Sequence, residues 1–386
     1  MRTPTDPALA DALVDTVRSF VIKDVLPVAS EFEHADRYPA ELVETMKQIG
    51  LFGCLAPEEF GGLDLDTVTY ARIIEELAAG WMSLSGFLNT HMMCTTLLKL
   101  HGTDEQRKRL LPKLATGEIR GALSLSEPDA GSDTKSLRCK ATPDGEEYIL
   151  DGTKMWVTNG ERSGLVALAA RAPEGITCFM VEKDPGPQFG GISVSKTIGK
   201  LGYKGLETVE MTYAGHRVPA EAVLGGPENL GKGLHQILGG MELGRVNVAS
   251  RAVGVARAAF EAAIAYAQQR ETFGVPIAKH QAIQFKLADM ATRVEAARLL
   301  TRSAAEKLDR GERADVEAGM AKLFASEAAL DNAVEAMRIH GGYGYTTEFP
   351  VERYFRDAPL MIIGEGTNEI QRIVIARGLL SRYAEQ

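Results

Sequence analysis

The amino-acid sequence predicts a mainly α-helical protein in which a central antiparallel β domain lies between two helical domains. Three observations predict this order. Apolar residues recur at helical spacing from residue 8 to about 118, short apolar runs between dense turn residues follow to about 225, and alanine-rich amphipathic stretches fill the rest. A chain of 386 residues is also too long for one compact core. We therefore expect domains over 1–120, 121–226 and 227–386.

Start and stop residues mark the expected helices of the N-terminal domain. Pro39 precedes a segment whose apolar residues share one helix face, and Gly50 follows it. Asp66 stands before a second segment of the same kind. The residues from Thr103 to Gln106 open a short helix that Gly117 would end.

The pattern changes in the middle of the chain. Turn pairs such as Asp151-Gly152 and Asn159-Gly160 separate short apolar or alternating runs, which is typical of an antiparallel sheet. Helical periodicity returns after Gly225-Gly226-Pro227. We place the long C-terminal helices at 233–269, 279–310, 314–340 and 367–382.

Composition and charge exclude several classes of protein. A net charge of −9 provides no broad basic face for nucleic acid. The four cysteines lack Cys-x-x-Cys spacing and the seven histidines are scattered, so neither a redox pair nor a metal site is expected. No signal-peptide pattern begins the chain, and no apolar run approaches the roughly 18 residues that a membrane span needs. We expect a soluble, cytoplasmic protein.

Two nucleotide-binding motifs are absent or incomplete in this sequence. The stretch from Gly226 to Gly233 is similar to a phosphate-binding loop, but Gly233 stands where a Ser or Thr would hold Mg²⁺. No Gly-x-Gly-x-x-Gly sequence occurs, so a Rossmann site is not supported. We interpret 226–233 as the linker between the β domain and the C-terminal helices.

The segment Gly364-Glu365-Gly366-Thr367 has the strongest chemical signal. It places one carboxylate between two glycines, just before a helical run. Flanking glycines allow positive φ and close approach to a ligand, and a helix N-terminus favours an ionised carboxylate. Glu365 is therefore a candidate general base. An exposed Glu in a helix-capping loop would give the same short pattern.

This loop and the upstream segment from Phe349 to Asp357 together resemble the C-terminal sequence of the acyl-CoA dehydrogenase family, whose base is a Glu in an E-G-T loop. The predicted order of helical, β and helical domains matches the fold of that family. The resemblance spans nearly the whole chain. It implies an FAD-dependent oxidation of an acyl-CoA thioester.

Two segments of the β domain resemble flavin-binding sequences of the family. The run from Leu123 to Asp133 is similar to T-E-P-x-A-G-S-D, with Ser126 replacing the usual Thr and keeping its hydroxyl. The run from Lys154 to Gly160 reads K-M-W-V-T-N-G, although a hairpin turn after a core Trp is the plainer interpretation. The resemblance assigns to the FAD site Leu123, Leu125, Ser126, Ser132, Trp156 and Thr158.

Further FAD contacts are implied near the C-terminus. The sequence Arg270-Glu271-Thr272-Phe273-Gly274, followed by His280-Gln281, resembles a family segment that reaches the FAD of a neighbouring subunit. A homotetramer is therefore expected, with a dimer as the alternative. Glycines after Arg338 allow close approach to a phosphate, although the family more often has Gln at that position. The segment that carries Glu365, residues 364–367, is called the base loop below. The resemblance assigns to the FAD site, from these segments and from the base loop with the residues that follow it, Arg270, Phe273, Gln281, Arg338, Gly341, Gly342, Thr367 and Glu369.

Substrate-binding positions follow from the same resemblance. Glu242 and Arg245 match residues that contact CoA, and Ser132 and Gly366 join them. Some members place the catalytic Glu where this chain has Gly244, which leaves Glu365 as the base and opens space near the acyl pocket. Small residues there hint at a branched or cyclic acyl group. The absence of Arg between residues 80 and 98 argues against a dicarboxylic substrate.

The resemblance implies that Glu365 removes a proton from the α carbon while flavin N5 accepts a hydride from the next carbon. The product would be a trans-2-enoyl-CoA, and electron-transferring flavoprotein would take the electrons. Two alternatives use the same scaffold: an acyl-CoA oxidase that reduces O₂, and a dehydrogenase that acts on acyl-carrier protein. A non-catalytic flavoprotein is a more remote alternative.

Overall fold

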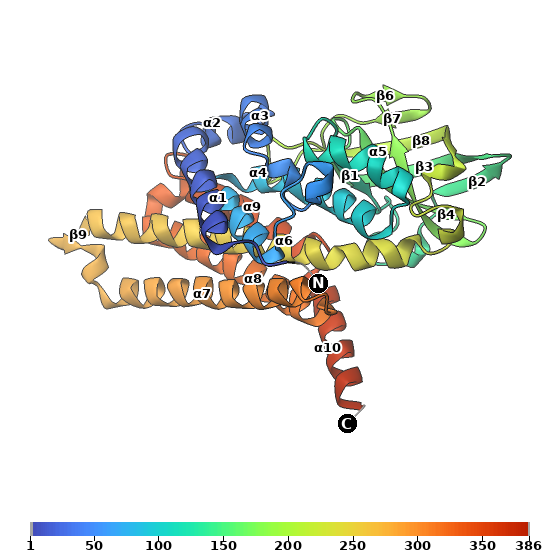
Figure 1. The fold of residues 1–386 in the computed structure, drawn as a ribbon. Coiled ribbons are helices and arrows are strands. Elements are labelled where there is room, and N and C mark those ends of the chain that lie inside the picture. The colour runs from blue at the N-terminus through green and yellow to red at the C-terminus, as the bar shows by residue number, and fades with distance from the viewer. Residues whose placement is uncertain (1–2, 385–386) are drawn as a thin grey trace.

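The computed structural model describes residues 3–384 and contains helical, β and helical parts in that order (Figure 1). The fold predicted from the sequence is confirmed. The N-terminal helices are α1 (Pro7–Phe20), α2 (Ala29–His34), α3 (Ala40–Gln48), α4 (Thr67–His101) and α5 (Asp104–Ala115). The C-terminal helices are α6 (Gly233–Gln269), α7 (Gln281–Asp309), α8 (Asp315–His340), α9 (Val351–Ile363) and α10 (Asn368–Ala384).

Helix α4 joins the two helical parts. The side chain of Asp66 caps it by accepting a hydrogen bond from the Thr69 N–H at 2.7 Å. Most of its residues are buried, and it packs against both α1 and α6. Gly254 of α6 lies so close that a Cβ there would come within 2.4 Å of the Glu75 carbonyl oxygen. The helical core therefore contains residues from both ends of the chain.

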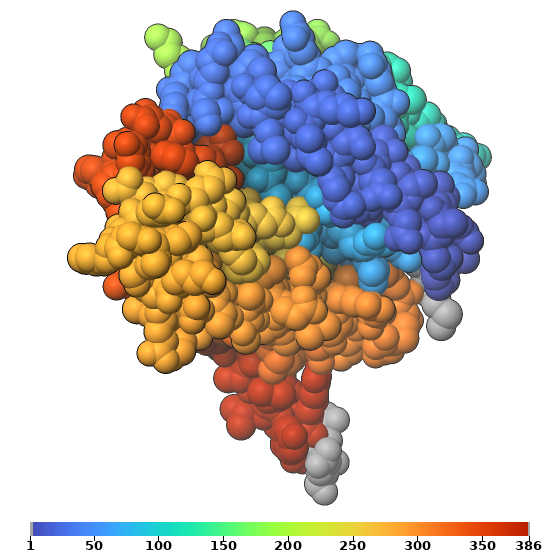
Figure 2. Space-filling model, turned by 90° about the vertical axis from the view of Figure 1, so that its left-hand side faces the viewer, coloured from blue at the N-terminus to red at the C-terminus, as the bar shows by residue number. Residues whose placement is uncertain are grey.

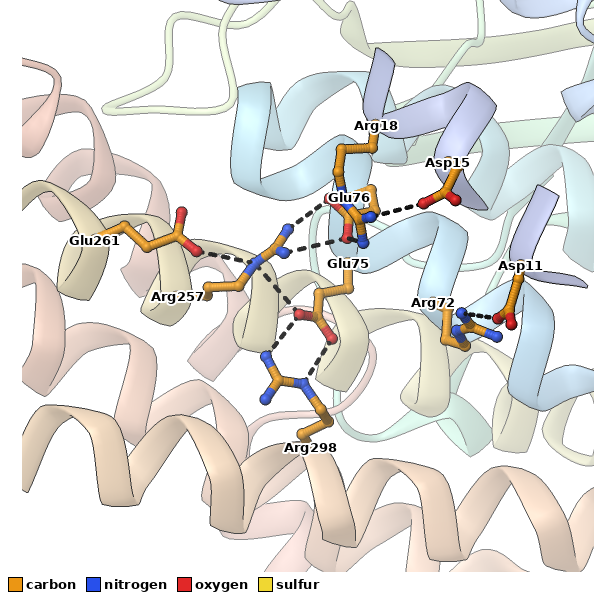
Figure 3. Close-up of polar contacts among 9 residues, drawn as sticks. All are labelled: Asp11, Asp15, Arg18, Arg72, Glu75, Glu76, Arg257, Glu261 and Arg298. Carbon is orange, nitrogen blue, oxygen red and sulfur yellow. Dashed lines mark hydrogen bonds and ion pairs between the residues drawn. The ribbon is translucent and has the colours of Figure 1, made fainter. Parts of the chain in front are cut away.

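An ionic network crosses this helical interface (Figure 3). Glu76 of α4 accepts hydrogen bonds from Arg18 of α1 and Arg257 of α6. Its neighbour Glu75 accepts two from Arg298 of α7. Burial raises the pKa of Glu76, but the hydrogen bonds from Arg257 and Arg18 outweigh it and lower that pKa overall. The network fixes α4, which lies against the base loop described below.

The sheet of the β domain is mainly antiparallel. Its strands are β1 (Gly121–Ser124), β2 (Lys140–Asp144), β3 (Glu147–Thr158), β4 (Leu165–Ala172), β5 (Gly175–Glu182), β6 (Gln188–Phe189), β7 (Ile192–Val194) and β8 (Thr208–Pro219). The order is β1-β4-β2-β3-β8-β7-β6, with β5 paired to β4. Strands β1 and β4 pair in parallel, a departure from the antiparallel expectation. The sheet has its own apolar core.

A register shift in the β3–β8 ladder sets the direction of Trp156. The pairing skips from Lys154 to Val157 on β3, and Trp156 has a φ of 62°. Such irregularities redirect a side chain away from the regular alternation of the strand. The indole is consequently 58% exposed, whereas Lys154 and Val157 are buried. This Trp is therefore not a core residue.

Helices α6, α7 and α8 form an elongated bundle in the lower part of the molecule as drawn in Figure 1. A hairpin of β9 (Glu271–Thr272) and β10 (Val275–Pro276) joins α6 to α7 at the end of the bundle remote from the sheet (Figure 1). Helix α10, in red, projects from the body of the molecule in both views (Figures 1 and 2). Within residues 3–384, no helix combines the length and apolar content needed to cross a bilayer.

His91 ties α4 to the start of the sheet. Its Nδ1 accepts a hydrogen bond from the Gly121 N–H at 3.1 Å, and its Nε2 lies 3.1 Å from the Phe52 carbonyl oxygen. A neutral ring with its proton on Nε2 satisfies both contacts. His91 is thus a packed helix residue. Because Gly121 begins β1, this bond helps to place the segment that follows β1.

We expect His91 to make the protein more stable as the pH rises from about 4 to 6.5. Burial lowers the pKa of His91 from 6.5 to about 4, so the folded protein binds fewer protons than the unfolded chain in this window. The stabilisation is lost as the pH falls and amounts to about 3 kcal/mol at its maximum. Thermal unfolding between pH 4 and 7 should show a smaller pH dependence for His91→Gln. The exposed control His235→Gln should behave like wild type; an unchanged slope for His91→Gln would contradict the assignment.

Candidate active site

Glu365 lies between α9 and α10, with its carboxylate directed towards α4 and α6. The amide of Asn89 on α4 donates a hydrogen bond to Glu365 Oε1 at 2.9 Å. The other oxygen, Oε2, lies over Gly244 of α6, where an added Cβ would stand 2.9 Å away. The carboxylate is therefore held at a junction of three segments that are far apart in sequence. An exposed capping Glu would have no such contacts, so the plainer interpretation of the loop is wrong.

The structure corrects the expected role of Gly244. Its missing side chain does not open the acyl pocket, because the Glu365 carboxylate occupies that space. Met93 Sδ would lie 3.5 Å from a Cβ at the same position. Gly244 is needed so that α6 can approach the carboxylate closely.

The backbone of the base loop differs in detail from the expectation. Gly364 has a φ of −71°, whereas Glu365 itself has a φ of 57° and Gly366 one of 82°. A positive φ is costly for a residue with a side chain and persists only where its surroundings enforce it. Buried Gln371 provides part of this support, because its Nε2 donates to the carbonyls of Glu365 and Gly366 at 3.1 and 2.9 Å.

Arg245 of α6 lies near the Glu365 carboxylate, and Glu242 lies near Arg245 on the same helix. Arg245 is 7% exposed and forms no ion pair with any residue of the range 3–384, and its Nε is buried without a hydrogen-bond partner. Glu242 accepts one hydrogen bond, from the Ala314 N–H at 3.1 Å. A buried guanidinium with unused donors favours an anionic ligand.

The two predicted flavin segments are bound to each other. Lys154 is fully buried on β3, and its Nζ donates to the Leu125 carbonyl at 2.9 Å and to Glu127 Oε1 at 2.8 Å. The Met155 N–H donates to the Ser126 carbonyl at 2.8 Å. The Glu127 carboxylate also accepts from two backbone N–H groups, of Arg138 and Cys139. These contacts bring the end of β1 alongside Trp156 and Thr158.

This region fits a flat, polar ring system. The hydroxyls of Ser126 and Thr158 donate to no other group of the described chain, and the Trp156 indole is exposed beside them. An exposed aromatic ring next to free hydroxyl groups can bind a ligand that stacks on the ring and hydrogen-bonds to the hydroxyls. Leu123 and Leu125 are half-buried in the same segment, while Ser132 is exposed on the following loop.

A second cluster forms at the far end of the bundle. Arg270, Gly341 and Gly342 line a cavity of about 490 Å³ with Tyr266 and His340. At the tip of the nearby hairpin, Phe273 is 97% exposed and has a φ of 53°. Gln281 is exposed at the start of α7, and Arg338 is exposed and paired with Glu335.

Within one chain, the predicted residues therefore divide into separate groups. Arg245 lies near Glu365, with Glu242 near Arg245. Gly366 and Thr367 follow Glu365 in the same loop, and Glu369 lies in the first turn of α10. The flavin segments adjoin the sheet. In contrast, the hairpin with Phe273 lies at the opposite end of the molecule from the sheet (Figure 1).

Four residues that contact the site were missed by the sequence reasoning. Asn89 and Gln371 contact the base loop directly, Lys322 contacts it from α8, and Lys154 holds the flavin segments together. For Lys154 the sequence did contain a signal, because this lysine is the first residue of the K-M-W-V-T-N-G string. The other three stand inside helices and have no local pattern that marks them.

Comparison with known proteins supports the resemblance over nearly all of the chain. Three family profiles match: "Acyl-CoA dehydrogenase, N-terminal domain" over residues 8–118, the middle domain over 122–215 and the C-terminal domain over 231–380. An acyl-CoA dehydrogenase of Bacillus subtilis is 42% identical over 370 residues, which cover 94% of this chain and 96% of that protein.

Solved structures agree with this result. Butyryl-CoA dehydrogenase from Megasphaera elsdenii superposes with a TM-score of 0.92 at 34% identity, covering 98% of this chain and 100% of that one. A prolyl acyl carrier protein oxidase superposes with a TM-score of 0.91 at 33% identity, covering 97% and 100%. The similar structures thus include both a dehydrogenase and an oxidase.

Proposed function

Because the chain belongs to the acyl-CoA dehydrogenase family, whose members are FAD-dependent flavoproteins, we propose that it oxidises an acyl-CoA to its trans-2-enoyl-CoA with Glu365 as the base. The observation that carries this proposal is the carboxylate of Glu365, held by Asn89 over Gly244 with the unpaired Arg245 on the same helix. Bound FAD supplies the acceptor for the hydride that leaves the β carbon.

The base acts on a weak carbon acid. Glu365 takes the proton from the α carbon, and its own backbone N–H donates to the thioester oxygen as negative charge develops there. The Asn89 amide and the close approach of Gly244 fix one orientation of the carboxylate, which reduces the entropy lost in reaching the reactive geometry. Arg245 and Glu242, with Ser132 and Gly366, bind the CoA portion.

We assign the isoalloxazine ring to the segment that carries Leu125, Ser126, Trp156 and Thr158. Arg270, Phe273 and Gln281 bind the FAD of a neighbouring subunit, because their hairpin lies far from the sheet of their own chain (Figure 1). The remaining positions assigned to the cofactor are Leu123, Ser132, Arg338, Gly341, Gly342, Thr367 and Glu369.

We further propose a homo-oligomer, a tetramer in preference to a dimer. Apolar side chains on the projecting α10 support this assignment, because Leu380 and Tyr383 are both 72% exposed. Phe285 and Leu299 on α7 are also uncovered. We propose domains over residues 1–120, 121–226 and 227–386. We also propose that the protein is cytoplasmic and that electron-transferring flavoprotein accepts the electrons from its reduced FAD.

An acyl-CoA oxidase is the second candidate, since an oxidase is among the similar structures. Turnover of acyl-CoA in air should be followed with an oxygen electrode and a peroxide assay, then repeated anaerobically with electron-transferring flavoprotein. Turnover that needs the flavoprotein supports a dehydrogenase. Oxygen uptake with stoichiometric peroxide would replace it with the oxidase. Activity on acyl groups linked only to carrier protein would change the substrate class.

A further inference from the structure

Lys322 is a buried cation whose three donors contact the base loop and the two helix ends that flank it. It lies on α8 and has 0% relative exposure. Its Nζ donates to the carbonyls of Ile362 and Gly366 at 3.1 and 3.0 Å, and to Asn368 Oδ1 at 2.8 Å. An ammonium group has three N–H donors, so this set satisfies it completely. Every acceptor belongs to the seven-residue stretch from 362 to 368 that contains Glu365.

The contacts span both sides of the base. Ile362 precedes Glu365 and lies at the end of α9, whereas Gly366 and Asn368 follow it and lead into α10. One ammonium therefore fixes the spacing between the two helices that the loop connects. Asn368 is itself bound to Ser326 of α8 at 3.0 Å, which adds a second attachment to the same helix. These contacts support the positive φ of Glu365.

The positive charge of Lys322 has consequences beyond the three hydrogen bonds. Lys322 has no salt bridge to any carboxylate in the described chain, and burying an unpaired cation costs folding free energy. Burial lowers the pKa of Lys322 to about 8. Of the charged groups that face it, Glu365, Glu369 and Glu327 raise this pKa, and Arg245 lowers it. A neutral donor could hold the same carbonyls at a lower cost in folding free energy. We therefore infer that the positive charge of Lys322 has a role beside the Glu365 carboxylate.

We propose that Lys322 is a positioning residue for Glu365, holding the base loop in its reactive conformation through its protonated ammonium group. This inference rests on the proposed function for its kinetic readout, but its structural part does not. The protonated form is present below about pH 8 and is lost as the pH rises through that value. The positioning therefore weakens at alkaline pH.

The chain offers a matched control in Lys183. It is 5% exposed, its Nζ donates to the carbonyls of Glu161 and Asp184 at 3.1 and 3.0 Å, and burial lowers its pKa to about 8. Lys183 thus resembles Lys322 in burial, bonding and titration, but among the described residues its ammonium group makes no hydrogen bond to the base loop. Comparing Lys322→Met with Lys183→Met separates the general effect of losing a buried lysine from the specific effect of losing the contacts with the base loop.

The test measures FAD-loaded enzyme with an acyl-CoA that reduces the wild-type flavin. Lys322→Met should lower kcat about 10²-fold with little change in KM, and its kcat should lack the wild-type decline above pH 8. Lys322→Arg, which keeps the charge, should recover part of kcat. Lys183→Met should keep the wild-type kcat and pH profile. An equal loss in both methionine variants, or an unchanged kcat in Lys322→Met, would overturn the proposal.

Amide hydrogen exchange tests whether Lys322 holds the base loop without requiring catalytic turnover. Peptides covering 362–372 should exchange at least about 10-fold faster in Lys322→Met than in Lys183→Met, because only the first variant frees the loop carbonyls. Unchanged exchange would remove the positioning role. If wild type reacts with no acyl-CoA, the proposed function fails, and the exchange result still decides whether Lys322 holds the loop.

Discussion

Replacing Glu365 by Gln should reduce the rate of flavin reduction by substrate by about 10²–10⁴-fold, the range attributed to a general base. The amide keeps the size of the carboxylate and can still accept the hydrogen bond from Asn89. It cannot take a proton from the α carbon. FAD content and acyl-CoA binding should therefore stay near wild type while chemistry is lost. Rapid-reaction absorbance measurements under anaerobic conditions follow this step directly.

A control for the removal of one carboxyl charge is Glu348→Gln. Glu348 is exposed and lies upstream of α9, and it forms no ion pair within the described residues. Its variant should reduce flavin at the wild-type rate. If Glu365→Gln also reduced flavin normally, another residue would have to be the base, and the assignment of this loop would be wrong.

Lys154→Met should destabilise the protein by about 3–5 kcal/mol and release FAD. The change leaves the buried Glu127 carboxylate without its cation, which is the costly way to break a buried ion pair. Burial alone raises the pKa of Glu127, and Lys154 with the N–H groups of Arg138 and Cys139 lowers it. The Leu125 carbonyl also loses its partner. Thermal unfolding and the 450 nm absorbance of purified protein report the two effects.

Lys140→Met is the matched control for this prediction. Lys140 is exposed on the neighbouring strand β2, and surface substitutions of that kind usually change stability by less than about 0.5 kcal/mol. It should retain FAD. A Lys154→Met protein that unfolds at the wild-type temperature with a full complement of FAD would show that the two flavin segments hold together without this lysine.

Local signals in the sequence predicted most of the long helices, although α9 had no counterpart among the expected segments. The capping residues Asp66 and Thr103 mark the starts of α4 and α5, and both accept the expected backbone hydrogen bonds. Alanine periodicity placed α6 at its observed bounds. Capping and periodicity depend on residues only a few positions apart, so a single sequence contains the information.

Features that depend on distant segments were not predictable in the same way. The bulge that exposes Trp156 depends on pairing with β8, and the parallel pairing of β1 depends on β4. Gly244 was interpreted as empty space because nothing in the sequence indicates that a carboxylate 121 positions later fills it. Asn89 is farther still from Glu365, at 276 positions in sequence. These contacts are set by the packing of α4 and α6, which only the fold reveals.

We expect this chain to bind FAD and to use it to oxidise an acyl-CoA. The most direct test is the visible spectrum of the purified protein during anaerobic titration with acyl-CoAs of straight, branched and cyclic acyl groups. We expect a yellow protein whose flavin absorbance is bleached by one of these classes, which also identifies the substrate. A colourless protein that cannot be reconstituted with FAD, or a yellow protein that no acyl-CoA bleaches, would contradict the proposed function.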